Sequence, residues 1–230
     1  MKKILVTGGA GYIGSHTVVE LVVAGFGAII VDNFSNSSPE VLERLETITG
    51  KNIPFFKGSI SDKDLMNQIF KDNHIDAVIH LAAYKSVEES VREPLKYYEN
   101  NVSAGIALLE VMKEHKVEHI IFSSSATVYG MNHCSSLTGD LSISATNPYG
   151  YTKLMMEQIL TDLALAHSDW SVTNLRYFNP IGAHESGLIG EAPNGIPNNL
   201  MPYITQVAVG KLQELSVFEN DYDSDNHVNI

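Results

Sequence analysis

The sequence predicts a doubly wound α/β fold, in which one parallel sheet is covered by helices on both faces. Short runs rich in β-branched residues alternate with longer segments of helical periodicity, which is typical of parallel strands joined by helices. A glycine-rich turn also follows the first apolar run directly. With 230 residues, the chain is long enough for one such domain with a sizeable core and short for two.

Six apolar runs predict the strands of the sheet, at residues 3–6, 28–31, 54–57, 77–80, 119–122 and 171–175. Helical segments begin near Gly14, Pro39, Asp62, Pro94 and Tyr149. Six strands joined by five crossovers predict the strand order 3-2-1-4-5-6. After residue 177, glycine, proline and asparagine become frequent, so we expect long loops there, suited to contacting a substrate.

Composition and charge exclude several classes of function. The net charge of -12 argues against a nucleic-acid-binding surface. A single cysteine, Cys134, permits no internal disulfide and is compatible with a reducing compartment. Glycines interrupt the first apolar run too early for an export signal, and the apolar stretch at residues 21–31 is about half a membrane span. We therefore expect a cytoplasmic protein without a membrane segment.

The turn at residues 7–14 predicts a dinucleotide site. Gly8, Gly11 and Gly14 lie between the first strand and a helix, where glycines let the backbone approach a pyrophosphate and the helix N-terminus offers free N–H groups. Asp32 follows Gly14 by eighteen residues, at the end of the second strand, where a carboxylate binds a ribose and repels a 2′-phosphate. The sequence therefore favours NAD over NADP.

A Tyr–Lys pair predicts acid–base chemistry. Tyr149 and Lys153 are four residues apart at the start of a predicted helix, so one helical face carries both side chains. A neighbouring ammonium and a positive nicotinamide ring would favour the tyrosine phenolate as a base. A serine run at residues 123–125 follows the fifth strand, at the carboxyl edge of the sheet, and one of these hydroxyls could share a proton with Tyr149.

These motifs carry a family resemblance. The glycine turn, the Asp32–Asn33 pair, residues 123–130 and the Tyr149/Lys153 pair resemble the extended short-chain dehydrogenase/reductase family, whose Rossmann-like domain binds NAD. The narrower resemblance is to UDP-glucose 4-epimerases. It rests on the strings GYIGSH (11–16), SSATVYG (124–130), LRYFNP (175–180) and GIPNNLMPY (195–203).

The resemblance implies that UDP-galactose and UDP-glucose interconvert at sugar carbon 4 through a 4-keto intermediate, with NAD as the hydride carrier. Tyr149 would be the base, Ser125 would bridge to the 4-hydroxyl, and Lys153 would hold the nicotinamide ribose. Lys85, Asn179 and Asn199 would contact the UDP-sugar. The cofactor would be lined by Gly8, Gly11, Tyr12, Ile13, Gly14, Asp32, Asn33, Asn36, Ser37, Ser59, Ile60, Leu81, Ala82, Lys85, Asn100, Ser123, Tyr149, Lys153 and Phe178.

The resemblance further implies a homodimer formed through helices at residues 94–115 and 149–166, and a division into an NAD-binding domain at 1–178 and a partial UDP-sugar-binding region at 179–230. Ser59 stands where the family has an aspartate against adenine. After Phe218 the family's arginine-bearing strand has no counterpart. The sequence therefore predicts an incomplete, C-terminally truncated substrate region, with NAD binding but poor turnover of UDP-galactose.

Other functions remain possible interpretations of the sequence. A nucleotide-sugar dehydratase would need an acid pair where this chain has Ala126 and Thr127, whereas another epimerase of the family or a non-catalytic NAD-binding fragment fits the motifs. His115 and His119 have a spacing of four, but the residues between them resemble a helix-to-strand junction, so no metal site is expected.

Overall fold

The computed structural model describes residues 1–131, 136–194 and 199–216. Its centre is a parallel sheet in the order β3-β2-β1-β4-β5-β6, which confirms the predicted strand order. The strands are β1 (Lys3–Thr7), β2 (Gly27–Asp32), β3 (Phe55–Lys57), β4 (Ala77–His80), β5 (His119–Ser125) and β6 (Ser171–Tyr177). Cys134, part of the 195–203 string and residues 217–230 lie outside the described residues.

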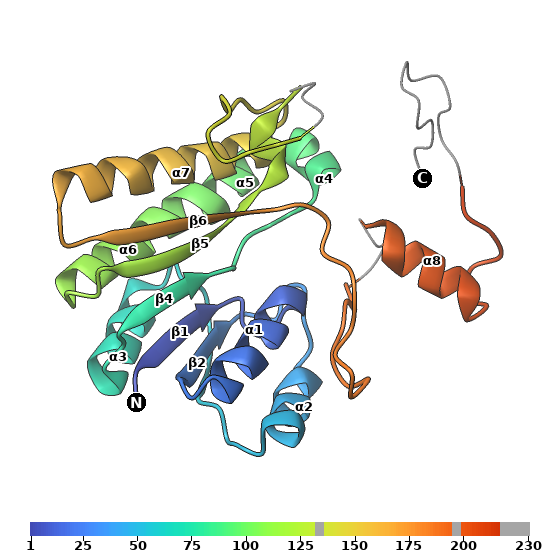
Figure 1. Ribbon diagram of the computed structural model, residues 1–230, viewed down its shortest axis with the longest axis horizontal. Helices are drawn as coiled ribbons and strands as arrows, with labels where there is room; N and C mark the ends of the chain where they lie inside the picture. Colours follow the sequence, from blue (N-terminus) through green and yellow to red (C-terminus); the bar gives the residue numbers. More distant parts are fainter. Residues whose placement is uncertain (132–135, 195–198, 217–230) are drawn as a thin grey trace.

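Helices connect successive strands and cover the sheet (Figure 1). They are α1 (Tyr12–Val23), α2 (Glu40–Thr49), α3 (Lys63–Asn73), α4 (Val87–Arg92), α5 (Pro94–Tyr98), α6 (Ala104–Glu114), α7 (Pro148–Ala166) and α8 (Leu200–Ala208). A π-helical turn at Glu99–Ser103 joins α5 to α6, and a 3₁₀ turn at Ala126–Tyr129 follows β5. Each predicted helix start lies within two residues of an observed one.

The core lies on the two faces of this sheet. Leu5 and Ile29 belong to one buried cluster, which α3, α6 and α7 complete, whereas their chain neighbours Val6 and Ile30 belong to a second, completed by α1 and α2. Because successive side chains of a strand point to opposite faces, the two clusters lie on opposite sides. The fold is therefore the doubly wound arrangement that the sequence predicts.

The structure corrects the prediction for the end of the chain. Residues 200–208, expected as loop, form helix α8, and the short helix α4 after β4 was not predicted at all. In α8 the apolar side chains recur at helical spacing, and Pro202 is tolerated because it lies in the first turn, where its missing N–H costs no intrahelical hydrogen bond. High proline content was therefore a misleading sign of loop there.

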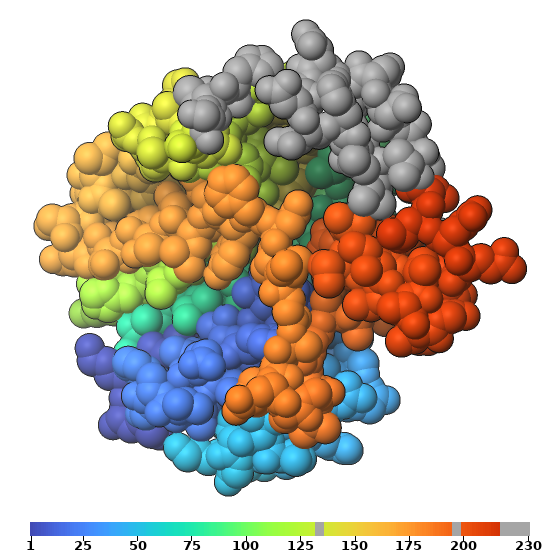
Figure 2. All heavy atoms as spheres, turned by 45° about the vertical axis from the view of Figure 1, so that its right-hand side comes forward, coloured from blue at the N-terminus to red at the C-terminus, as the bar shows by residue number. Residues whose placement is uncertain are grey.

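From residue 178 to residue 194 the structure has no helix, as predicted. We call residues 181–194 the strap. An antiparallel bridge between Ala183 and Gly190 closes its middle, and Ile189 is buried in the same cluster as α1 and α2. Figure 2 shows this segment, in orange, passing across the blue and cyan surface of the N-terminal elements.

Candidate active site

The glycine turn after β1 has the geometry that its sequence predicts. Gly8 adopts a φ of +70°, and a Cβ added there would meet the Ala82 nitrogen at 2.8 Å. A Cβ on Gly14 would lie 2.2 Å from the Gly8 oxygen. Gly11 is the N-cap of α1, so the first backbone N–H groups of the helix face the turn. Side chains at Gly8 and Gly14 are therefore excluded by close backbone packing.

Asp32 lies beside this turn, at the end of β2. Its Oδ2 accepts a hydrogen bond from the Ala10 amide at 3.1 Å, and its Oδ1 accepts from the Phe34 amide at 2.8 Å and the Ser37 hydroxyl at 3.0 Å. An ionised carboxylate has about four acceptor positions. Three are used within the protein, so one remains on Oδ2 for a ligand hydroxyl.

A cleft of about 1270 Å³ lies at the carboxyl edge of the sheet. Every residue to which the sequence assigned a cofactor, substrate or catalytic role lines it. These are Gly8, Gly11, Tyr12, Ile13, Gly14, Asp32, Asn33, Asn36, Ser37, Ser59, Ile60, Leu81, Ala82, Lys85, Asn100, Ser123, Ser125, Tyr149, Lys153, Phe178, Asn179 and Asn199.

The predicted catalytic side chains meet in this cleft, at the start of α7 and the end of β5. Asn147 caps α7 by accepting a hydrogen bond from the Gly150 amide at 2.8 Å, which fixes the first helical turn. The Lys153 ammonium donates to the Ser123 carbonyl at 2.7 Å and lies 5.9 Å from the centre of the Tyr149 ring. Lys153 is buried. The Tyr–Lys pair therefore shares one helical face, as its spacing predicts.

The electrostatics of the pair differ from the sequence expectation. Burial raises the pKa of Tyr149, and a side-chain hydrogen bond with Ser125 lowers it in partial compensation. Burial also lowers the pKa of Lys153 to about 7. Burial therefore opposes the charged form of both side chains.

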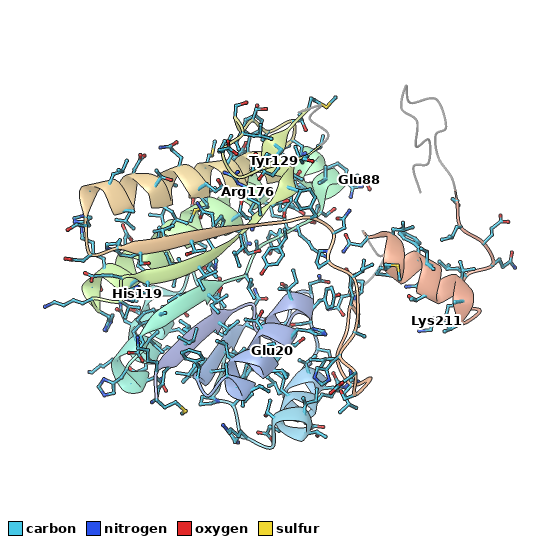
Figure 3. All side chains as sticks on the ribbon, viewed as in Figure 1. Glu20, Glu88, His119, Tyr129, Arg176 and Lys211 are labelled. Carbon is cyan, nitrogen blue, oxygen red and sulfur yellow. The ribbon has the colours of Figure 1, made fainter. Side chains whose placement is uncertain are left out.

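Beneath the pair lies an ionic network that the sequence analysis missed. Glu157, one turn after Lys153 on α7, accepts hydrogen bonds from Arg176 Nε at 3.0 Å, from Arg176 Nη2 at 2.8 Å and from the Ser124 hydroxyl. Arg176 also donates to the Tyr129 hydroxyl at 3.2 Å, and the two side chains lie together in Figure 3. The network ties α7 to β5 and β6. The buried Glu157 gave no sign of it in sequence, because its partners lie far along the chain.

A second missed residue is Glu191, at the end of the hairpin in the strap. Its Oε1 accepts hydrogen bonds from the Lys85 ammonium at 3.2 Å and from the Asn199 side-chain amide at 2.5 Å. Thr127 is a third: its Oγ1 is buried in the cleft wall without a hydrogen-bond partner in the described part of the chain. Its neighbour Ala126 is also neutral, so no acid pair stands at the dehydratase position.

The asparagines before α6 lie in the π-helical turn. Asn100 lines the cleft and donates to the Asn101 side-chain oxygen at 2.9 Å. Asn101 is buried and bonds Thr152 on α7 at 3.1 Å. π-Turns are frequent at functional sites, because they re-aim side chains that an α-helix would place elsewhere.

The histidine pair has other contacts. The His115 Nε2 and the Asn67 Oδ1 are 2.9 Å apart, and His119 is exposed at the start of β5. Across residues 1–131, 136–194 and 199–216, no three His, Cys, Asp or Glu side chains come together as metal ligands would. In the same ranges no helix combines the length and apolar character that a bilayer crossing requires.

A doubly wound sheet with a glycine-turn cleft, and with Ser, Tyr and Lys side chains gathered in that cleft, defines a dinucleotide-binding protein of the short-chain dehydrogenase type. The chain belongs to the NAD dependent epimerase/dehydratase family, whose family model matches residues 4–224.

Individual relatives agree with this assignment. The chain is 59% identical over 219 residues to a UDP-glucose 4-epimerase of Bacillus subtilis (strain 168), covering 95% of this chain and 65% of the relative. It is 58% identical over 223 residues to the enzyme of that name from Neisseria meningitidis serogroup B, covering 96% of this chain and 66% of the relative. The chain thus spans about two thirds of the length of the curated relatives that it matches.

Solved structures show the same likeness. A UDP-glucose 4-epimerase from Bifidobacterium longum in complex with NAD+ and UDP superposes with a TM-score of 0.95 at 52% identity, covering 97% of this chain and 67% of that one. A Stenotrophomonas maltophila epimerase with bound NAD and formylated UDP-arabinopyranose gives a TM-score of 0.94 at 50% identity, over 98% of this chain and 67% of that one.

Proposed function

We propose that this chain binds NAD in its cleft and interconverts UDP-galactose and UDP-glucose at carbon 4 of the sugar. The residues fit the cofactor. Gly8 and Gly14 keep the turn open to a pyrophosphate, the N-terminus of α1 offers free N–H groups, and Asp32 keeps one acceptor position for the adenosine ribose. The NAD named in the two similar structures supports this assignment.

In the proposed reaction, bound oxidised NAD supplies a hydride acceptor and a positive charge near Tyr149. Tyr149 takes the proton of the sugar 4-hydroxyl as the hydride leaves carbon 4, so that a 4-keto sugar forms. Ser125, whose side chain lowers the pKa of Tyr149 against the effect of burial, would share this proton. Tyr149 would then return its proton to the sugar oxygen, while the bound cofactor would supply the hydride to the other face of carbon 4, so that the epimer forms and every group is regenerated.

The observation that carries this proposal is the meeting of Ser125, Tyr149 and Lys153 in the glycine-turn cleft. The protonated fraction of Lys153 holds positive charge under the tyrosine ring, and together with the charge on the oxidised cofactor it favours the phenolate that burial opposes. The charge of bound oxidised NAD would therefore add to that of Lys153 in favouring the basic form of Tyr149.

The substrate side is proposed to start at residue 179, after an NAD-binding domain at 1–178. Asn179 and Asn199 line the cleft, and so does Lys85, which lies in the loop after β4. Amide and ammonium groups donate to hydroxyls and diphosphates, as a UDP-sugar requires. The Thr127 hydroxyl, which has no hydrogen-bond partner among the residues that the structure describes, offers one further donor or acceptor to the sugar.

The proposal is tested by purifying the chain, measuring co-purifying NAD, and assaying the interconversion of UDP-galactose and UDP-glucose. We expect bound NAD in the wild type and in Tyr149→Phe. Turnover should fall about 10²–10⁴-fold in Tyr149→Phe, because general acid–base catalysis contributes about that much.

Tyr151→Phe is the matched control, since Tyr151 is exposed on the same helix and should keep full turnover. NAD binding without turnover in the wild type would favour the non-catalytic NAD-binding alternative. An equal rate in Tyr149→Phe would contradict the proposed base.

We further propose a homodimer through α6 and α7. Ile106 on α6 is 39% exposed, and Tyr151 and Met155 on α7 are each 42% exposed. The last two are four residues apart and so lie on one helical face. Apolar helix faces of this kind support association with a second copy. Sedimentation of wild type and Met155→Glu tests it: the variant should be monomeric.

A further inference from the structure

The cleft is crossed by an internal carboxylate. Glu191 is held in place by the hairpin of the strap, in which the His184 amide donates to the Ile189 carbonyl at 3.0 Å and Ile189 itself is buried. The Glu191 side chain is 10% exposed. Burial, and secondarily the charge of Glu191, raises the pKa of Tyr12 at the start of α1.

Glu191 pairs with Lys85, which differs from the other cationic side chains of the cleft because its partner is a charged side chain and not a backbone carbonyl. Three cationic side chains line the cleft within the described residues. Lys153 donates to the Ser123 carbonyl and Arg44 to the Leu188 carbonyl at 3.3 Å, so both have neutral backbone partners. Lys85 instead pairs with the Glu191 carboxylate across 3.2 Å, and its side chain remains 40% exposed.

The same carboxylate oxygen also accepts from Asn199 at 2.5 Å. Lys85 follows β4 and Asn199 precedes α8, and the Glu191 carboxylate bonds both of these side chains. An ammonium and an amide that converge on one anionic oxygen form the arrangement that would also bind a phosphate oxygen. Glu191 thus stands where an anionic ligand group would find its donors.

We propose that Glu191 is an internal competitor for nucleotide diphosphates: it occupies Lys85 and Asn199 in the free protein and is replaced by a ligand phosphate on binding. The inference rests on the proposed function and adds a residue that sets ligand affinity. Because the carboxylate must release both donors and then lie near a like charge, it weakens diphosphate binding and speeds release.

The test is a double-mutant cycle in UDP affinity, measured by calorimetry on the whole chain loaded with NAD. Glu191→Gln keeps the size of the side chain and removes its charge. We expect it to bind UDP about two- to fivefold more tightly than wild type, the range for releasing a partly exposed ion pair. In a Lys85→Met background, the same change should tighten binding less, because no ammonium remains to be released and only the Asn199 contact and the like-charge repulsion are left.

Glu88→Gln is the matched control: Glu88 also lines the cleft, but its side chain is 81% exposed and pairs with Arg92 at 3.4 Å. It should leave UDP affinity unchanged. Unchanged or weaker binding in Glu191→Gln overturns the competitor role, and so does equal tightening in the Lys85→Met background. If the wild type binds no UDP, both this inference and the proposed function fail.

Discussion

The two walls of the cleft are held by different kinds of contact. On the catalytic side, Lys153, Glu157 and Ser124 are buried within regular elements, and Arg176 joins β6 to α7 with two hydrogen bonds to one carboxylate. The strap is attached through one buried side chain, Ile189, and a few exposed hydrogen bonds. The comparison suggests that the catalytic wall unfolds only with the domain, whereas the strap can open alone.

The largest effect should come from breaking the network on the catalytic wall. Glu157→Ala leaves the Arg176 guanidinium without its carboxylate, and the free energy of unfolding should fall by about 3–5 kcal/mol. Urea unfolding followed by circular dichroism measures it. Glu20→Ala, at an exposed site on α1, should change stability by less than about 0.5 kcal/mol. Equal losses in the two variants would contradict the distinction between the walls.

Removing the anchor of the strap should act locally. Ile189→Ala deletes a buried side chain, and docking of the strap should weaken by about 2–4 kcal/mol. Hydrogen exchange should then accelerate at the His184 amide, which bonds the Ile189 carbonyl, and stay unchanged in β5. If the β5 amides accelerate to the same extent, the strap and the sheet open as one unit.

The stability of the domain should depend on pH through His80, which is buried at the end of β4. Burial, and secondarily the charge of Lys153, lowers the pKa of His80 to about 3 from its ordinary value near 6.5. Below pH 6.5 the unfolded chain binds a proton at this position that the folded chain does not, so stability present above pH 6.5 is lost as the pH falls. Between pH 6.5 and 5 the loss should be about 2 kcal/mol.

This slope should be smaller in His80→Gln, measured by urea unfolding at both pH values. Hydrogen exchange of the strap amides should depend on His80 protonation only to the extent that these amides exchange through global unfolding. A slope that persists unchanged in the variant would assign the effect to other groups.

The smallest effect should come from Tyr12→Phe. The Tyr12 hydroxyl donates to the Gly182 carbonyl at 2.8 Å near the surface, and losing it should weaken strap docking by about 0.5–1.5 kcal/mol. Exchange at the His184 amide again reports it. Global stability should be indistinguishable from wild type.

The parts of the molecule that could be predicted are those that depend on short local sequence patterns. The strand order follows from alternating apolar runs, and the cleft from the glycine turn with Asp32 and from the Tyr149/Lys153 spacing. Glu157 and Glu191 were missed because their partners are 19 to 33 and 8 to 106 residues away, and isolated glutamates carry no local pattern. The effect of burial on the pKa of Tyr149 could not be predicted, because sequence spacing shows a neighbouring charge but not burial.

The sequence did contain features that favour helix α8, but the loop-like composition around it was given more weight. Asn199 is a favoured residue before a helix, and the apolar spacing after it is helical, but the surrounding prolines and asparagines resembled a loop. A proline within the first turn should be read as a sign of a helix start rather than its absence.

Helix α7 carries Tyr149, Lys153 and Glu157 at intervals of four residues. Each interval advances about 40° around the helix axis, so the three side chains share an arc of about 80°. Inserting one residue between Lys153 and Glu157 would rotate the glutamate by about 100° relative to the lysine and turn it from Arg176. The segment between Lys153 and Glu157 therefore cannot gain or lose even one residue without losing this alignment. An insertion beyond Ala166, where the helix ends, would leave the alignment intact.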